Sequence, residues 1–321
     1  MTARSPLHVI LGAGGAIGRP LAQELLARGT PLRTVSRTGH GPEGAEIVRA
    51  DLLDADDVLN AVGDGATVHL LAGLAYDRRV WADQWPRIMR NVIDACAAKQ
   101  ARLVFFDNVY LYGSVDGPMT EETPVRPSSR KGTIRAEIVR DLEDAIGAGR
   151  VTAAVARAAD FYGPHAEKTS PIAFLVLQKL AAGKRAQILV DADTRHSYTY
   201  TSDAVKALTL MAEADDAFGQ AWHLPTARPA LTHRQIVELA ARELGVAPRL
   251  TVAPRWVLEA AGVFSTLLRE VAEMAYQNDH DYLFDSSKFE RRFGVAPTTY
   301  EDGIRATVKG MRQPQSPPVR S

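Results

Sequence analysis

The stretch His8-Val9-Ile10-Leu11-Gly12-Ala13-Gly14-Gly15-Ala16-Ile17-Gly18 decides the fold of this chain. A short strand-like run leads directly into glycines at positions 12, 15 and 18. Glycine lacks a Cβ and tolerates positive φ, so this backbone can turn tightly and approach a diphosphate closely. Gly12 is suited to the turn, Gly15 to the phosphate contact and Gly18 to packing of a following helix. The stretch therefore predicts a dinucleotide site.

The sequence after the glycines supports this interpretation. Residues 17–28 have the pattern of an amphipathic helix, with Leu21, Leu25 and Leu26 on one face and Gly29 as a stop. A helix N-terminus supplies free N–H groups and a partial positive charge to an anion. A glycine triplet alone is a weak signal, and the alternative is an ordinary strand-to-helix turn.

The end of the next strand indicates which dinucleotide is bound. Residues 32–35 read as a strand, and Ser36-Arg37 follow it. An acidic residue there holds the ribose 2′-hydroxyl of NAD, whereas Arg suits the 2′-phosphate of NADP. No acidic residue is present, so we expect NADP(H) in preference to NAD(H). The alternative is that Arg37 is a solvated loop charge.

Composition and charge exclude several classes of protein. The chain has 321 residues, 46% of them hydrophobic, with 38 Lys and Arg against 38 Asp and Glu. This balance shows no electrostatic footprint for nucleic acid or an anionic membrane. Cys96 is the single cysteine, which rules out an intrachain disulfide and fits a reducing, cytoplasmic compartment. We see no signal peptide, no apolar run long enough to span a bilayer and no metal-ligand spacing.

Strand and helix patterns alternate in the first half of the chain. The short strands are apolar on both faces, as a buried parallel sheet requires. After about residue 160 helical patterns dominate. We predict an α/β fold: a Rossmann-type doubly wound parallel sheet over residues 1–160, a smaller, mainly helical substrate lobe over 161–312 that is interleaved with it, and a disordered tail over 313–321.

With these pieces in order, the chain resembles the extended short-chain dehydrogenase/reductase superfamily, in particular its NAD-dependent epimerase/dehydratase branch. The resemblance rests on the glycine loop, Ala50-Asp51-Leu52, His69 to Gly73, Tyr112-Gly113, Phe161 to Pro164, Arg195 to Asp203 and Asp285 to Lys288. It implies an NAD(P)-dependent oxidoreductase. The expected cofactor-binding residues are Gly12, Gly14, Gly15, Ala16, Ile17, Gly18, Ser36, Arg37, Asp51, Leu52, Leu71, Ala72, Gly73, Asn108, Lys131, Arg135 and Ala158.

The catalytic positions of the resembled family differ in this chain. The family uses Ser or Thr five residues before the glycine of Val-Tyr-Gly, where this sequence has Asn108. The family then uses Tyr-x-x-x-Lys, where this sequence has Lys131 and Arg135. We predict that Lys131 replaces the tyrosine as acid/base and that Asn108 holds the substrate oxygen.

Lys131 and Arg135 are four residues apart, so they share one face of a helix. Burial and the neighbouring Arg135 would favour a neutral amine at Lys131, and Arg135 can donate hydrogen bonds to ribose. The alternatives are a solvated Lys131 at a helix start and an Asn108 that caps a turn. Tyr112 is a further catalytic candidate, and His196 can titrate near neutrality. The expected substrate residues are Tyr110, Tyr162, Arg195 and Tyr198, although aromatic core packing is the commoner fate of tyrosine.

We therefore expect an NADP(H)-dependent oxidoreductase that acts on a small carbonyl or alcohol. The alternatives are a nucleotide-sugar epimerase or dehydratase and a non-catalytic NADP(H)-binding redox sensor. The resemblance also implies a homodimer through helices 85–99 and 130–146. The first helix has an apolar stripe of Ile88, Val92, Ala95 and Cys96, and a stripe that faces the protein's own core would look the same.

Overall fold

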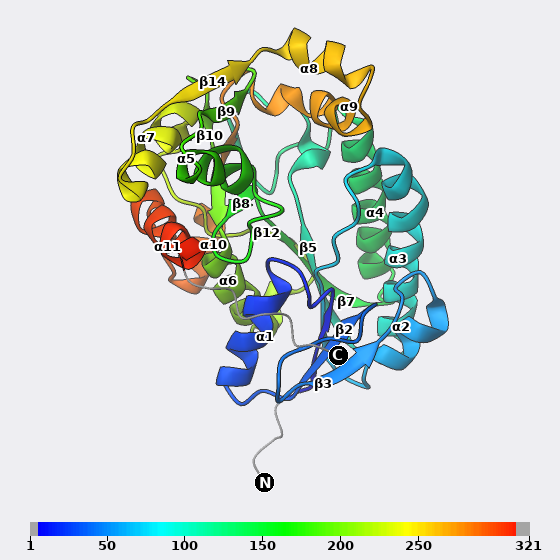
Figure 1. Cartoon of the computed structure of the whole chain (residues 1–321). Coiled ribbons are helices and arrows are strands. Elements are labelled where there is room, and N and C mark those ends of the chain that lie inside the picture. The colour runs from blue at the N-terminus through cyan, green and yellow to red at the C-terminus, as the bar shows by residue number, and fades with distance from the viewer. Residues whose placement is uncertain (1–5, 313–321) are drawn as a thin grey trace.

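A parallel sheet of seven strands forms the centre of the computed structural model, which describes residues 6–312 (Figure 1). Its order is β12-β7-β5-β4-β1-β2-β3, and every pair of neighbours is parallel. The strands are β1 (His8–Leu11), β2 (Leu32–Ser36), β3 (Glu46–Arg49), β4 (Thr67–Leu70), β5 (Arg102–Asp107), β7 (Thr152–Arg157) and β12 (Ala221–His223). The order reverses at β1, between β2 and β4, and ligands bind at the carboxyl ends of strands at such a point.

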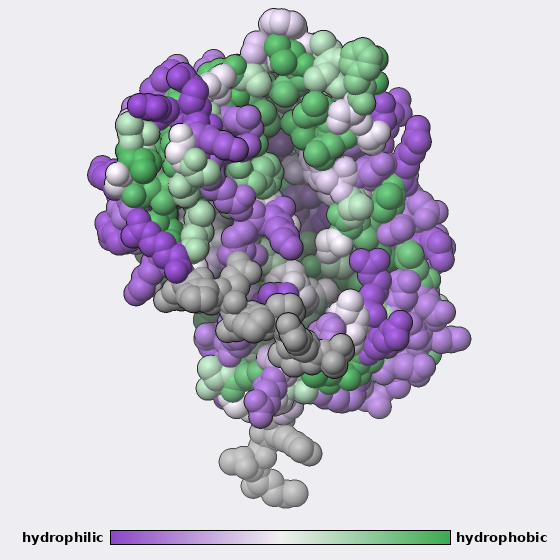
Figure 2. Space-filling model, in the orientation of Figure 1, coloured by the Kyte–Doolittle hydropathy of each residue, from purple (hydrophilic) through white to green (hydrophobic). Residues whose placement is uncertain are grey.

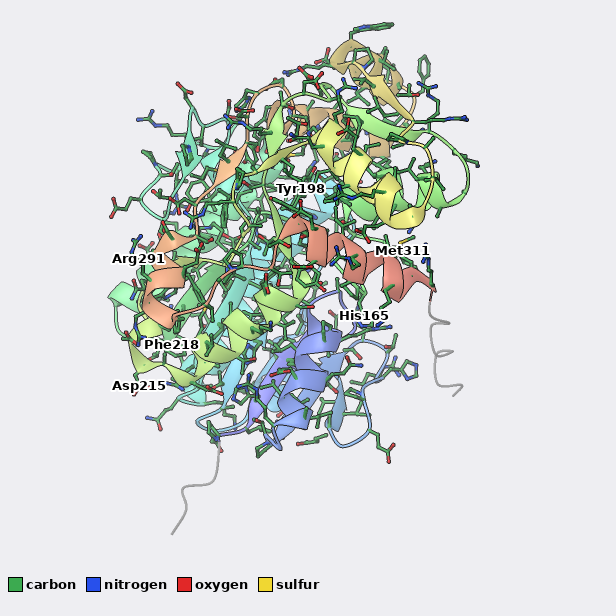
Figure 3. The ribbon with its side chains drawn as sticks, turned by 90° about the vertical axis from the view of Figure 1, so that its left-hand side faces the viewer. His165, Tyr198, Asp215, Phe218, Arg291 and Met311 are labelled. Carbon is green, nitrogen blue, oxygen red and sulfur yellow. The ribbon has the colours of Figure 1, made fainter. Side chains whose placement is uncertain are left out.

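Helices cover both faces of the sheet. On one face lie α2 (Ala55–Ala61), α3 (Arg78–Ala98) and α4 (Arg130–Gly147), and on the other α1 (Gly18–Ala27) and α6 (Thr201–Glu213) (Figure 1). Figure 3 turns the face with α1 and α6 toward the viewer. Val9, Ile10 and Leu11 are fully buried, because a strand of this sheet faces helices on both sides. The predicted Rossmann-type fold is confirmed.

A mainly helical part follows β7. It contains β8 (Asp160–Tyr162), which pairs in parallel with β11 (Tyr198–Tyr200). Its longer helices are α7 (His233–Leu244), α8 (Arg255–Gly262), α9 (Thr266–Glu273) and α11 (Tyr300–Arg312). Its shorter elements include β9 (Ala186–Leu189), β14 (Leu250–Ala253), α5 (Gln178–Ala181) and α10 (Ser287–Phe293). The predicted tail, 313–321, lies outside the described residues.

Helices α8 and α9 form a hairpin at one end of the molecule, at the top of Figure 1. Its outer surface is apolar, as the green side chains at the top of Figure 2 show, with Trp256 69% and Phe264 93% exposed. Its inner side is charged, because the one buried residue of α9 is Glu270. Polar contacts, rather than burial of apolar surface by α9, therefore attach this helix to the sheet domain.

Several boundaries differ from the sequence patterns. Helix α3 begins at Arg78 and not at residue 85, because the Asp77 side chain caps it and Pro86 is accommodated inside it. Residues 172–177 form a π-helical turn before α5. The segment 221–224, which has a short strand-like pattern, contains β12 and extends the central sheet. Helices α10 and α11 were not predicted.

In the range 6–312, no helix has the length and apolar character needed to span a bilayer.

Candidate functional site

The glycine loop lies where β1 ends and α1 begins. Gly12 has φ of 99°, and a Cβ there would lie 2.8 Å from the backbone N and Cα of Ala72 after β4. A Cβ on Gly18 would lie 2.6 Å from the Gly12 carbonyl oxygen. Gly14 and Gly73 face open space. The helix start at Ile17 has no side-chain cap. The Arg19 N–H donates to the Gly15 carbonyl oxygen at 3.1 Å and Pro20 has no N–H, so in the first turn the Gly18 N–H is the group left for an anion. These residues fit the diphosphate of a dinucleotide.

The expected adenosine end of the site lies at the carboxyl ends of β2 and β3. The Ser36 hydroxyl contacts the turn through the backbone of His40, 3.3 Å away, and Arg37 is exposed. Arg49, which sequence reasoning missed, is the register partner of Ser36 on β3 and is also exposed. Within residues 6–312, neither arginine makes an ion pair. In the sequence, the signal for Arg49 was a basic residue at the end of β3, the strand that pairs with β2.

The remaining cofactor candidates lie along the same edge of the sheet. Asp51 and Leu52 follow β3, Leu71 to Gly73 follow β4, and Ala158 follows β7. Asn108 follows β5, and its Oδ1 accepts a hydrogen bond from the Tyr110 N–H at 3.0 Å. In this structure Asn108 therefore caps a turn, which is the alternative to a contact with the substrate oxygen.

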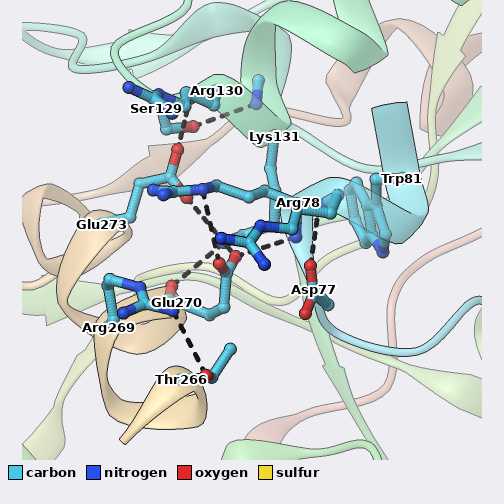
Figure 4. A network of polar contacts seen from close by, with 12 residues as sticks. Asp77, Arg78, Trp81, Ser129, Arg130, Lys131, Thr266, Arg269, Glu270 and Glu273 are labelled. Atoms are coloured by element: carbon cyan, nitrogen blue, oxygen red, sulfur yellow. Dashed lines mark hydrogen bonds and ion pairs between the residues drawn. The ribbon is translucent and has the colours of Figure 1, made fainter. Parts of the chain in front are cut away.

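Lys131 is fully buried at the start of α4, and its three N–H donors all have acceptors (Figure 4). Its Nζ lies 2.5 Å from Glu270 Oε2, 2.8 Å from Glu273 Oε2 and 3.1 Å from the Glu270 carbonyl oxygen. It also lies over the Tyr76 ring, 4.6 Å from the centroid. The lysine is therefore neither solvated nor free to donate to a substrate in this conformation. It joins α4 to α9.

Arg135 contacts a carboxylate that sequence reasoning missed. Its Nε and Nη2 lie 2.8 Å and 2.5 Å from Asp107 Oδ1, at the end of β5. The guanidinium also lies over the Trp85 ring, 4.5 Å from the centroid, and the side chain is 3% exposed. Arg157 pairs with the other oxygen of Asp107 at 3.2 Å. Arg135 thus binds the carboxyl end of β5 through Asp107, and its expected contact with ribose stays a prediction.

Tyr112, a catalytic candidate, lies in the core. Its hydroxyl is 2.8 Å from His223 Nε2 and accepts a hydrogen bond from Arg157 Nη1 at 2.7 Å. Only 1% of the side chain is exposed, and burial raises the pKa of its phenol. The His223 Nδ1 faces the Asp285 carbonyl oxygen. The contacts of Tyr112 are those of a buried polar network.

The expected substrate residues lie in three different surroundings. Tyr110 is half-buried and stacks on Trp81, with ring centroids 6.2 Å apart. Tyr162 is 1% exposed and packs on α11 at Gly303, and Tyr198 contacts His233 Nδ1 at 3.2 Å. Arg195 is exposed and pairs with Asp281. The structure does not bring these four side chains together on one surface.

The structure places two other titratable groups side by side beyond the end of β7. Asp160 begins β8, and its Oδ2 lies 3.2 Å from His196 Nε2. The Asp160 side chain is 23% exposed, whereas His196 is 2% exposed. Sequence reasoning missed Asp160, although a carboxylate just past a buried strand was the signal. Among the described residues, no group of three or more His, Cys, Asp or Glu is arranged to hold a metal.

Comparison with known proteins agrees with this geometry. The profile of the "NAD dependent epimerase/dehydratase family" matches residues 8–224. A dTDP-6-deoxy-L-talose 4-dehydrogenase (NAD(P)(+)) of Kitasatospora kifunensis is 27% identical over 76% of this chain and 81% of that protein. A dTDP-4-dehydrorhamnose reductase of Mycolicibacterium smegmatis is 31% identical over 62% of this chain and 58% of that protein.

Solved structures show the same fold. UDP-glucose 4-epimerase of Thermus thermophilus, solved with NAD, superposes with a TM-score of 0.79 over 95% of this chain and 99% of that one, at 19% identity. The family match covers the glycine loop and all seven strands of the central sheet. The chain therefore belongs to the NAD-dependent epimerase/dehydratase family and is an NAD(P)-dependent enzyme of the short-chain dehydrogenase/reductase superfamily.

Proposed function

We propose that this enzyme catalyses hydride transfer between NADP(H) and a carbonyl or alcohol substrate. The observation that supports this most strongly is the position of the glycine loop, which abuts Ala72 at the reversal of strand order. A bound nicotinamide cofactor supplies or accepts the hydride. Gly12 to Gly18 would hold its diphosphate, and the residues after β4, β5 and β7 lie along the edge where its other half extends.

The preference for NADP(H) rests on Arg37 and Arg49. Both are exposed at the end of the sheet that would receive the adenosine ribose, and a guanidinium can bind a phosphate with two parallel hydrogen bonds. A side chain at Gly39 would lie 3.4 Å from Arg49 Cβ, so the turn after β2 packs on Arg49. The test is the ratio of dissociation constants for NADPH and NADH. We expect tighter binding of NADPH, and equal or tighter binding of NADH contradicts the preference.

The proposal that Lys131 acts as acid/base requires α9 to move. While Glu270 and Glu273 accept from its ammonium, no donor remains for a substrate. In that proposal, Lys131→Met abolishes turnover and leaves NADPH affinity nearly unchanged. Full turnover by this variant shows that another group supplies the proton.

The substrate class has two candidates. The first is a small carbonyl or alcohol compound. The second is a nucleotide sugar, favoured because two of the sequence relatives are named for reactions of dTDP-sugars. The enzyme is incubated with NADPH and a panel of both classes while the absorbance of the reduced nicotinamide is followed. Consumption with either class supports the oxidoreductase, and the responding class identifies the substrate. Binding of NADPH without consumption across the panel favours the alternative of a redox sensor.

We also propose a homodimer in the cytoplasm, formed through the outer faces of α3 and α4. The stripe of Ile88, Val92, Ala95 and Cys96 is buried within the chain, so it supports the core-facing alternative and not the interface. The outward residues of these neighbouring helices carry both signs of charge, including Arg90 and Glu137, and opposite charges can pair across a twofold axis. Light scattering tests this, and a monomer refutes it.

A further inference from the structure

Lys131 lies where the resembled superfamily has its tyrosine, yet every donor of its ammonium is bound by α9. A substrate beside this position would have to take the place of α9. We infer that the α8–α9 hairpin is a lid, latched over Lys131 by Glu270 and Glu273, which opens to admit the substrate. The role in substrate entry rests on the proposed hydride transfer, whereas the opening itself can be measured without a substrate.

The covered lysine lies on the side of the sheet where a substrate is expected. Helix α4 begins against the segment that follows β5, since a Cβ on Gly132 would lie 2.5 Å from the Tyr110 carbonyl oxygen. One turn further along α4, Arg135 binds Asp107, the last residue of β5. Ligands of such sheets bind beyond the carboxyl ends of the strands. The hairpin therefore covers a group that borders the expected substrate position.

Two carboxylates of α9 bind the starts of two long helices (Figure 4). Glu270 Oε2 accepts a hydrogen bond from the Arg78 N–H at 3.1 Å, at the first residue of α3. Glu273 accepts one from the Arg130 N–H, at the first residue of α4. Each contact places a negative charge at the positive end of a helix. The Lys131 ammonium and the Arg78 guanidinium complete the network, so two cations face two carboxylates.

The polarity of the hairpin favours a movable attachment. Glu270 is the one buried residue of α9, whereas large apolar side chains of the hairpin face solvent (Figure 2). The exposed set is Trp256, Val263, Phe264 and Leu267. Charged groups regain hydration when they separate, which offsets much of the attraction that they lose. Apolar packing has no such compensation. Contacts of this kind can therefore open while the core stays packed.

Helices α8 and α9 are built to move together. A Cβ on Gly262 would lie 3.0 Å from the Arg269 Cα, so the two helices approach each other closely. Both ends of the hairpin are fixed: β14, before α8, pairs with β9, and after α9 the Asn278 carbonyl oxygen accepts from the Thr194 hydroxyl at 3.2 Å. The hairpin can thus swing as one body between two fixed ends.

The latch has a buried end and an open end. Glu270 is 1% exposed, whereas Glu273 is 15% exposed. Arg78, Ser129 and Glu273 line part of a surface hollow of about 400 Å³, through which solvent reaches this end of the network. Water can therefore replace the contacts of Glu273 before those of Glu270. Release of the lid begins at Glu273, which makes this residue the one to alter.

Acetylation of amines under native conditions tests the lid on the whole protein. Lys131 can react only while α9 is away from it, and Lys99, which is 31% exposed, is the internal reference. Peptide mass spectrometry gives the rate at each lysine. We expect Lys131 to react at least about tenfold more slowly than Lys99. We also expect its rate to depend little on low concentrations of urea, because a local opening exposes much less surface than unfolding.

Two results of this experiment overturn the lid. In the first, labelling of Lys131 has the same urea dependence as global unfolding, which means that only the unfolded chain exposes the amine. In the second, Lys131 reacts as fast as Lys99, which means that α9 does not cover it.

A matched pair of variants tests the latch. Glu273→Gln removes a charge at its open end, and Glu259→Gln removes a charge from the same hairpin, in a surface pair with Arg255 at 2.9 Å. We expect Glu273→Gln to raise the labelling rate of Lys131 about tenfold and Glu259→Gln to change it less than about twofold. The reaction takes place in the open form, where Lys131 has left both carboxylates, so the rate reports the opening. Equal rates in Glu273→Gln and wild type overturn the latch.

Turnover tests the role of the lid in substrate entry. A larger open fraction lowers the apparent KM in proportion. On a substrate that the wild type consumes, we expect the KM of Glu273→Gln to fall at least about threefold, while NADPH affinity changes less than about twofold. Faster labelling of Lys131 with an unchanged KM overturns this role. Wild-type protein that consumes no substrate overturns the proposed function, and the labelling rates still test the lid.

Discussion

Replacing Lys131 by methionine separates its structural role from a catalytic one. Methionine keeps an unbranched side chain but removes the ammonium from a site where Glu270 is 1% exposed. The Glu270 carboxylate would keep its contacts with the Arg78 backbone N–H at 3.1 Å and with the Arg78 Nε at 3.9 Å. It would lose the Lys131 Nζ, which lies 2.5 Å from its Oε2. Removing one partner of a buried ion pair costs about 3–5 kcal/mol, and the contacts that Glu270 keeps with Arg78 favour the lower end of this range. We therefore expect the free energy of unfolding to fall by about that amount.

Two further variants make this prediction specific. Lys99→Met removes an ion pair with Asp64 whose partners are 31% and 86% exposed, and such a pair contributes less than about 1 kcal/mol. The double variant Lys131→Met/Glu270→Gln removes the unpaired charge, so we expect it to be more stable than Lys131→Met alone. Urea unfolding gives the free energies, and hydrogen exchange of residues 266–273 reports whether α9 detaches. A free energy of unfolding for Lys131→Met within about 0.5 kcal/mol of the wild-type value, together with lost turnover, would refute the structural reasoning. That result would support a catalytic lysine.

Three other perturbations test the cofactor site and the core. Gly12→Ala is expected to abolish NADPH binding in a titration, since its Cβ would lie 2.8 Å from backbone at φ of 99°; normal binding would exclude this loop as the diphosphate site. Arg37→Asp is expected to weaken NADPH binding at least about tenfold and to leave NADH affinity nearly unchanged. An equal loss of affinity for both cofactors would contradict a contact with the 2′-phosphate. Burial lowers the pKa of His8 to about 4 and of His69 to about 3, so stability is complete above pH 6.5 and falls as pH drops toward 4. At pH 5 each histidine lowers the free energy of unfolding by about 2 kcal/mol relative to pH 7.5. A urea midpoint that is equal at pH 7.5 and at pH 5 would contradict this.

The elements that local chemistry specifies were predictable from sequence. The glycine loop, the strands that flank it and the helix of residues 130–147 follow from short apolar runs, glycine positions and a serine cap. The start of α3 at Arg78 was harder, because its first turns are polar and Pro86 lies inside the helix. Residues 221–223 have a strand-like pattern, but three residues do not indicate that β12 pairs with β7.

The side-chain contacts of the candidate site depend on segments far apart in the chain. The partners of Lys131 lie 139 and 142 positions away on α9, in a stretch that reads as an ordinary amphipathic helix. Asp107, which pairs with Arg135, looked like the end of a buried strand. The contact between Asp160 and His196 depends on the parallel pairing of β8 with β11, which neither short segment indicates alone.

Transfer of deuterium from C4-deuterated NADPH to a product tests the central claim most directly. The enzyme is incubated with each C4 stereoisomer of the labelled cofactor and a responding carbonyl substrate, and the product is analysed by mass spectrometry. We predict an alcohol that carries one deuterium from one stereoisomer and none from the other. NADPH that binds while no product gains the label, across the carbonyl and nucleotide-sugar panel, would contradict an NADP(H)-dependent oxidoreductase.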